Sequence, residues 1–254
     1  KKDFSLEPKP FAVGLRIQHP QELININQYG KNTKLLPPAS YKLTYQTKEG
    51  RGVYSFCMCP GGYVVNASSE EKRLAINGMS YHDRNSQNAN SAIVVTISPK
   101  DYGTNPLDGL TFQRELEEKA YALGNGKIPI QTIKDFHNSV ESKKLGNISP
   151  IFKGDYQLTD LNQILPSYIS TSIKEALSNF DKKIPGFNDD DALLAGVESR
   201  TSSPVKIPRG ENLESHIKGI YPCGEGAGYA GGITTSAMDG LKVAESIIST
   251  YQNE

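Results

Sequence analysis

The stretch "IYPCGEGAGYAGGITTSAMDGLKVAESI", Ile220 to Ile247, combines a glycine-rich turn with a helix-like segment near the end of the chain. Within it, Gly226-Ala-Gly228-Tyr-Ala-Gly231 satisfies the G-x-G-x-x-G pattern of a dinucleotide-binding turn. A complete fingerprint opens a βαβ unit and has an acidic ribose ligand about 20 residues downstream. The helix predicted over 233–250 leaves no room for a second strand before Glu254. We therefore expect that this loop is not the first turn of a Rossmann-type unit.

The same loop still has the physical properties of a ligand contact. Glycines let a backbone approach a ligand closely, and a helix N-terminus presents unpaired N–H groups and a positive dipole potential. The acid Glu225 and the number of glycines favour ligand contact. The alternative is a non-catalytic binding or interaction domain in which the loop is only a tight turn between a strand and a helix. In either case an apolar stripe predicts one buried face for the helix; it comprises Ile233, Ala237, Met238, Leu241, Ala244 and Ile248.

Four stretches of this sequence resemble one family of flavoproteins: "YPCGEGAGYAGGITTSAMDG", "KPFAVGLRIQHPQELIN", "SFCMCPGGYVVNASSE" and "NGMSYHD". The sequence is similar to the C-terminal part of FAD-dependent dehydrogenases of the two-dinucleotide-binding-domain type, and most closely to a bacterial group described as uncharacterized FAD-dependent dehydrogenases. The resemblance covers most of the chain. The glycine segment indicates a flavoprotein, and its combination with Cys57-Met-Cys59-Pro-Gly-Gly specifies the group.

The resemblance implies an FAD-binding domain that is split in sequence. In such proteins the ADP-binding βαβ unit lies at the N-terminus, and the chain returns to it at its end. An acid of the returning segment contacts the ribitol or the pyrophosphate, and the following helix start directs backbone N–H groups at the pyrimidine edge of the flavin. Carried over to this chain, the implied FAD-binding residues are Gly224, Glu225, Gly226, Gly228, Gly231, Gly232 and Ile233. Many relatives have Asp where Glu225 stands.

The chain also departs from the family pattern, because it contains no N-terminal strand-turn-helix with a dinucleotide fingerprint. We therefore expect a C-terminal piece of an FAD-dependent oxidoreductase that passes a hydride or an electron pair between an organic substrate and flavin. The expected partners are a small-molecule substrate and the missing N-terminal FAD-binding region of the same protein. Without that region, the chain alone is expected to lack FAD and to be inactive.

Strand and helix patterns predict a mixed α+β fold. A β-rich part reaches to about residue 100, and helical spacing follows over 105–185, including a helix after Pro166 with a capping box at Ser172 and Glu175. We expect residues 1–190 to form a substrate domain, and 191–254 to be the returning strand and helix of the split α/β FAD domain. The predicted strands are 11–17, 41–46, 52–58, 63–67, 74–77, 92–97 and, before the glycine loop, 219–225.

Composition excludes several other classes of function. The 28 basic side chains equal the 28 acidic ones, so no overall charge favours nucleic acid or an anionic membrane. No apolar run approaches the ~18 residues of a transmembrane helix. The 3 cysteines do not make a disulfide framework, which favours a reducing, cytoplasmic location.

Five further side chains are candidates for the substrate side of a flavin. Cys57 and Cys59 are either thiols near the flavin or two small residues that point to one face of a strand, and we favour the second interpretation over a catalytic redox pair. His82 and Arg84 occupy a polar loop that either lines the substrate or is only solvated, and Arg200 is either a ligand contact or a surface arginine. We expect no metal site, either from the cysteines and histidines or from Asp189 to Asp191.

Overall fold

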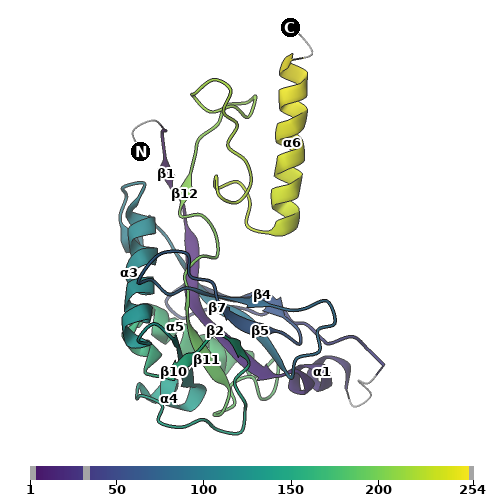
Figure 1. Ribbon diagram of the computed structural model, residues 1–254, viewed down its shortest axis with the longest axis vertical. Coiled ribbons are helices and arrows are strands. Elements are labelled where there is room, and N and C mark those ends of the chain that lie inside the picture. Colours follow the sequence, from purple (N-terminus) through teal and green to yellow (C-terminus); the bar gives the residue numbers. More distant parts are fainter. Residues whose placement is uncertain (1–3, 31–34, 252–254) are drawn as a thin grey trace. The chain divides into compact units, whose positions relative to one another are not determined.

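The computed structural model describes residues 4–30 and 35–251 and shows helices mixed with several sheets, which confirms the predicted α+β class (Figure 1). The chain divides into two compact units. Unit 1 comprises the described residues of 1–12, 97–113 and 200–254, and unit 2 comprises 13–96 and 114–199.

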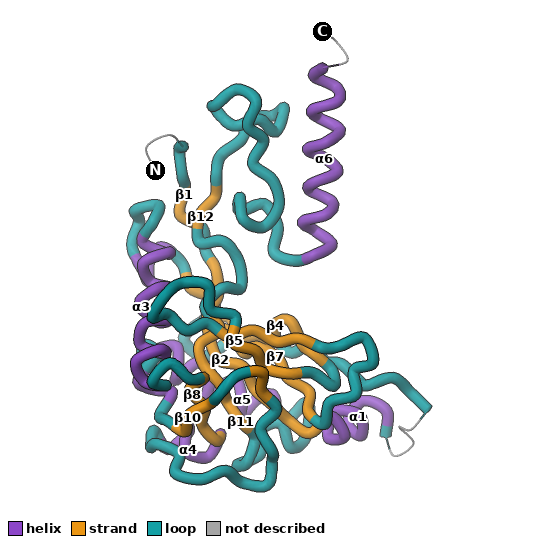
Figure 2. The backbone as a smooth tube through the Cα atoms, viewed as in Figure 1, coloured by secondary structure: helices purple, strands orange, loops and turns teal. Residues whose placement is uncertain are grey.

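Unit 2 is built on a seven-stranded sheet in the order β10-β8-β11-β2-β7-β4-β3. Figure 2 shows the strands in orange. Strands β8 and β10 pair in parallel, whereas β11 runs antiparallel to both β8 and β2, and β4 runs antiparallel to β7 and β3. The strands are β2 (Phe11–Pro20), β3 (Thr44–Gln46), β4 (Gly52–Cys59), β7 (Asn88–Ile97), β8 (Ile128–Thr132), β10 (Tyr156–Leu158) and β11 (Leu193–Glu198).

Helical segments and apolar side chains cover one face of this sheet. Helix α5 packs on β3 and β4, while α4 and the 3-10 helix η1 pack on β8. Gly196 lies within this core, because a Cβ there would lie 3.1 Å from Leu15 and 3.3 Å from Leu161. The helical segments of unit 2 are α1 (Gln21–Tyr29), α4 (Ile133–Asn138), η1 (Leu161–Gln163) and α5 (Ser167–Phe180), while α2 (Pro99–Tyr102) belongs to unit 1 and α3 (Asp108–Leu123) begins in unit 1 and ends in unit 2.

The predicted capping box of the second helix is wrong. Helix α5 begins at Ser167, directly after Pro166, so Ser172 lies inside it and its hydroxyl donates to Tyr168 O at 2.7 Å. Glu175 instead accepts a hydrogen bond from the Tyr45 hydroxyl at 2.7 Å. The apolar stripe already starts at Ile169, and its burial extends the helix toward the proline.

A second, three-stranded sheet covers the other face of the large sheet. It consists of β6 (Ile76–Met79), β5 (Tyr63–Asn66) and β9 (Phe152–Lys153), and β6 contacts both β4 and β11. Strand β2 is therefore buried on both faces, although it carries Arg16, Gln18 and His19. Buried polar side chains need partners, so the layer between the two sheets is where polar groups must pair.

Unit 1 contains a short ribbon and the last helix. Strands β1 (Glu7–Pro8) and β12 (Val205–Lys206) pair antiparallel, and a loop leads from β12 to α6 (Ile233–Tyr251). The strand predicted over 219–225 is wrong, since these residues form turns and irregular backbone. A strand needs a hydrogen-bonded neighbour, and the described part of the chain offers this segment none.

The predicted buried face of α6 is also wrong. Ile233 is 92% exposed and Leu241 is 67% exposed, whereas Asp239 and Val243 are the buried residues of the helix. Periodicity identified an apolar stripe correctly, but within the described residues no element covers it. Its other members, Ala237, Met238, Ala244 and Ile248, are exposed as well.

Candidate functional site

The glycine loop before α6 folds as two interlocked turns. Gly228 N donates to Glu225 O at 2.9 Å, and Tyr229 N donates to Gly224 O at 3.0 Å. Gly224 and Gly228 have positive φ values of 71° and 90°, and a Cβ at Gly228 would lie only 2.7 Å from Val205 O. These two glycines are therefore required by the fold of the loop itself.

The other glycines of the loop are not required by its fold in the same way. Among the described residues, and apart from its two neighbours in the chain, a Cβ at Gly226 or Gly231 would meet no atom within 4 Å, and one at Gly232 would meet only Thr235 Oγ1 at 3.7 Å. The backbone at the start of α6 is thus open to an incoming molecule. Because the first N–H groups of a helix have no acceptor within the helix, they can donate to an anion or a polar ring edge there.

Arg209 and Asp239 form an ion pair that holds the glycine loop. The guanidinium group donates from Nη1 to Asp239 Oδ2 at 3.0 Å and from Nη2 to Asp239 Oδ1 at 2.6 Å. Asp239 also accepts from Gly224 N at 2.8 Å, and the Arg209 Cζ atom lies 3.6 Å from the centre of the Tyr229 ring. The hydrogen bonds from Arg209 hold the pKa of Asp239 below its ordinary value. The sequence analysis missed both residues, because 30 positions separate them and no local pattern joins them.

The side chain of Glu225 is half-buried, and its charge affects the pKa of Lys9. Burial lowers the pKa of the Lys9 amine, and the charge of Glu225 partly offsets that effect. The role of Glu225 toward a cofactor stays a prediction.

In unit 2, the two sheets enclose a polar cluster around Arg16, whose side chain is fully buried. Arg16 pairs with Glu198 through Nε at 2.9 Å and Nη2 at 2.8 Å. Its remaining N–H groups donate to Cys57 O at 3.0 Å, Asn90 Oδ1 at 2.9 Å and Asn77 Oδ1 at 3.2 Å. All five guanidinium donors are therefore used. Sequence reasoning missed this cluster, although an arginine inside an apolar strand is a signal that a partner exists.

Irregular backbone in two strands makes the Arg16 cluster possible. The register of β4 shifts between Phe56 and Cys59, and that of β11 shifts between Ala195 and Glu198. Cys57 has a positive φ of 44°, and its carbonyl accepts from Arg16. A bulge of this kind re-aims the side chains around it. The regular alternation assumed for the Cys57–Cys59 pair in the sequence analysis is therefore wrong.

The three cysteines form no disulfide within the described residues. Cys57 and Cys223 are exposed, and Cys59 is half-buried. Burial raises the pKa of the Cys59 thiol, and the nearby Arg16 offsets this only in part. A neutral thiol is a poor nucleophile. This agrees with the expectation that the pair is not a redox centre, which stays a prediction.

The remaining predicted substrate residues lie on exposed backbone. His82 and Arg84 belong to the loop between β6 and β7, where Arg84 has a positive φ of 48°. Gly61 packs directly under this loop, because a Cβ there would lie 1.8 Å from Arg84 O. Arg200 is exposed in unit 1. Their roles toward a substrate stay predictions.

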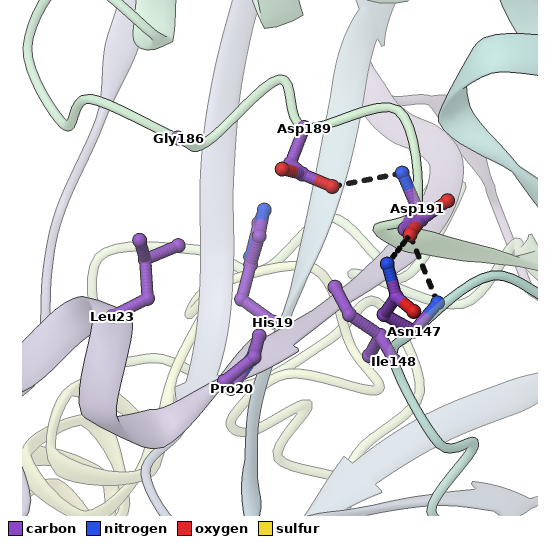
Figure 3. Close-up of a pocket in the computed structure, with 8 residues that line it drawn as sticks. All are labelled: His19, Pro20, Leu23, Asn147, Ile148, Gly186, Asp189 and Asp191. Carbon is purple, nitrogen blue, oxygen red and sulfur yellow. Dashed lines mark hydrogen bonds between the residues drawn. The ribbon is translucent and has the colours of Figure 1, made fainter.

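Unit 2 contains a small cavity of about 190 Å³ beside His19 (Figure 3). Asp191 is tied there to Asn147, whose backbone N and Nδ2 donate to its Oδ2 at 2.9 and 2.8 Å. Asp189 accepts from Asp191 N at 2.8 Å. These contacts give Asp189 and Asp191 a role in the loop structure. Within the described residues, no group of His, Cys, Asp or Glu side chains is suited to hold a metal ion.

Because of His19, we expect the free energy of unfolding to fall in acid. Its Nε2 lies 2.7 Å from Phe187 O, its Nδ1 has no partner among the described residues, and burial lowers its pKa to about 4. The unfolded chain binds this proton near pH 6.5, so the contribution of His19 is complete above that pH and is lost as the pH falls toward about 4. The loss should be about 3 kcal/mol.

The measurement for His19 is the free energy of urea unfolding at about pH 7 and about pH 4. His19→Gln keeps an N–H donor for Phe187 O but cannot take up the proton, so its stability should fall less between the two pH values. Equal pH dependence in the two proteins would contradict the assignment.

No helix within residues 4–30 and 35–251 has the length and hydropathy needed to cross a bilayer.

Comparison with known proteins gives a family and one relative. Residues 10–201 match the family model described as FAD-dependent protein, C-terminal domain-like. The chain is also 52% identical over 258 residues to an uncharacterized protein of Clostridium beijerinckii, in an alignment that covers 99% of this chain and 48% of the relative. The chain therefore spans about half the length of that relative. The glycine loop and α6 lie beyond the residues that the family model matches.

Proposed function

Because the chain belongs to the FAD-dependent protein, C-terminal domain-like family, we propose that it is the C-terminal part of an FAD-dependent oxidoreductase. The longer protein would pass a hydride or an electron pair between an organic substrate and FAD. FAD supplies the redox chemistry when bound, and this chain supplies positioning and electrostatics. The observation that carries the proposal is the open backbone at Gly226, Gly231 and Gly232, directly before and at the start of α6.

The start of α6 suits the flavin ring in particular. Its free N–H groups and its dipole favour negative charge, and negative charge accumulates on the pyrimidine edge of a flavin when the ring is reduced. In this proposal Gly231, Gly232 and Ile233 donate to that edge, while Glu225 contacts the ribitol or the pyrophosphate. Gly224 and Gly228 contribute indirectly, because they shape the loop.

The exposed stripe of α6 supports a further part of the proposal. Ile233, Met238, Leu241 and Ile248 form an apolar helix face that no described element covers. About half the length of the relative lies outside the aligned region, which is enough for an ADP-binding domain. We assign this face to the N-terminal FAD-binding region of the same protein. Its burial would fix the helix start against the cofactor.

Unit 2 would supply the substrate side of the enzyme. The polar cluster around Arg16 fixes the bulge that carries Cys57 and Cys59. The exposed loop with His82 and Arg84 lies near this bulge, because Gly61, which follows it, packs against Arg84 O. We propose that these side chains border the substrate. Arg200, which belongs to unit 1, stays a separate candidate for a contact with the flavin or the substrate. The dehydrogenase direction and the small organic substrate belong to the same proposal.

Flavin content tests the proposal. The chain of residues 1–254 should bind FAD weakly or not at all, because half of a site leaves most ligand contacts unmade. The protein extended at its N-terminus should carry FAD and should bleach when a reductant is added. The measurement is the flavin-to-protein ratio of both preparations after incubation with FAD. An extended protein that takes up no FAD would refute the proposed function, and a yellow chain of 1–254 would refute the split site.

A further inference from the structure

The contacts of Arg209 point to a role that goes beyond local stability. We propose that Arg209 is a positioning residue that holds the glycine loop in its FAD-binding shape before the cofactor arrives. The proposal rests on the proposed function of the loop. The residues concerned, Arg209, Asp239 and Tyr229, are called the Arg209 clamp.

The Arg209–Asp239 pair ties the entry of the loop to the helix. Besides its bidentate pair with Asp239, Arg209 donates from Nη1 to Pro222 O at 2.8 Å, just before the loop. Asp239 then binds the first glycine of the loop through Gly224 N at 2.8 Å. A single ion pair therefore fixes the entry of the loop relative to the body of α6. Because both side chains are about nine-tenths buried, this pair is screened less than a surface pair.

Tyr229 fixes the middle of the loop. Its ring lies 3.6 Å from Arg209 Cζ and 4.9 Å from Lys206 Nζ, and its hydroxyl donates to Ile207 O at 2.9 Å. Ile207 N in turn donates to Ala227 O at 3.1 Å. The loop is thereby anchored at 224, 227 and 229, while Gly226, Gly231 and Gly232 stay open. The residues that hold the loop are therefore not the residues whose backbone is open. This is expected if the held residues shape the backbone that the open glycines present to a ligand.

Pre-forming the loop has a kinetic signature. If only a fraction of the molecules has a competent loop, the apparent affinity falls by that fraction. The loss then appears in the association rate constant, since a bound cofactor holds the loop in shape whether or not the clamp is intact. A residue that contacts the cofactor directly would instead change the dissociation rate constant.

Arg209→Lys in the N-terminally extended protein is the test. Lysine keeps the charge but loses the fork that binds Asp239 and the planar group that stacks on Tyr229. With FAD as the probe, we expect about a tenfold lower association rate constant and an unchanged dissociation rate constant. Arg73→Lys, in an exposed ion pair of unit 2, is the matched control and should leave both rate constants for FAD unchanged.

Each outcome separates this inference from the proposed function. If Arg209→Lys binds FAD normally while Gly232→Val does not, the loop contacts FAD but Arg209 does not position it. A faster dissociation rate alone would make Arg209 a direct contact and overturn the inference. If neither change affects FAD binding, the loop does not contact FAD, and both this inference and the contact proposed for the loop fail, whereas an extended protein that takes up no FAD at all refutes the proposed function. Should Arg209→Lys not fold, Tyr229→Leu removes the stacking ring instead, and unchanged rates in that variant would also overturn the inference.

Discussion

Arg16→Met is expected to lower the free energy of unfolding by about 3–5 kcal/mol, the range found when one partner of a buried ion pair is removed. The methionine would leave the Glu198 carboxylate between the two sheets, only 3% exposed and without its guanidinium partner. It would also remove the hydrogen bonds that Arg16 donates to Cys57 O and to the side-chain oxygens of Asn77 and Asn90. Urea unfolding at neutral pH measures the loss.

Arg73→Met is the matched control for Arg16→Met. Arg73 also pairs with carboxylates, Glu70 and Glu118, but its side chain is 25% exposed and solvent screens the pairs, so the cost should be much smaller than that of Arg16→Met. Adding Glu198→Leu to Arg16→Met should recover part of the stability, because the unpaired charge is removed. If Arg16→Met costs no more than Arg73→Met, the Arg16 cluster does not hold the two sheets together.

Gly232→Val in the extended protein is expected to lower FAD affinity by about tenfold or more, because one or two hydrogen bonds from the start of α6 would be lost. The fold itself should tolerate the change, since only Thr235 Oγ1 lies near the added Cβ, at 3.7 Å. The remaining flavin should be harder to reduce, because the helix dipole would act from farther away. Glu225→Ala should weaken binding as well but shift the reduction potential less.

Gly240→Ala provides the control for Gly232→Val. Gly240 lies in the same helix, and a Cβ there would meet only Cys223 Sγ at 3.9 Å, so FAD affinity should not change. The measurements are the dissociation constant for FAD and the midpoint potential of each variant. A Gly232→Val protein that matches the original in both would make the loop a structural turn and favour a non-catalytic binding domain.

The sequence predicted the elements whose signal is local. The β-branched and aromatic runs of β2 and β4 and the helical spacing of α3 and α6 are visible in any short window. Strands β8 and β11 were missed, because Pro129 interrupts the first and the adjacent Ala195 and Gly196 weaken the strand signal of the second. The segment 219–225 shows the opposite error, since strand-like residues form a strand only beside a neighbour.

The candidate sites divide in the same way. The glycine loop follows from a contiguous motif, and the resemblance to flavoproteins explained its position in the chain. The paired side chains could not be predicted from a contiguous motif. Arg209 and Asp239, which support the loop, are 30 positions apart, and Arg16 and Glu198 of the unit 2 cluster are 182 apart. Such pairs become visible only when the fold brings them together. The bulge at Cys57 is equally non-local, since its carbonyl is held by an arginine of another strand.

Hydrogen–deuterium exchange of the backbone amides at Gly231, Gly232 and Ile233 tests the central claim most directly. These amides lie at the open start of α6, and in the extended protein they should exchange more slowly when FAD is bound, because they then donate to the flavin. The amides of the last turn of α6 serve as the internal reference and should not change. Protection confined to the helix start is the result that this account predicts. Identical exchange at these three amides with and without FAD would contradict it.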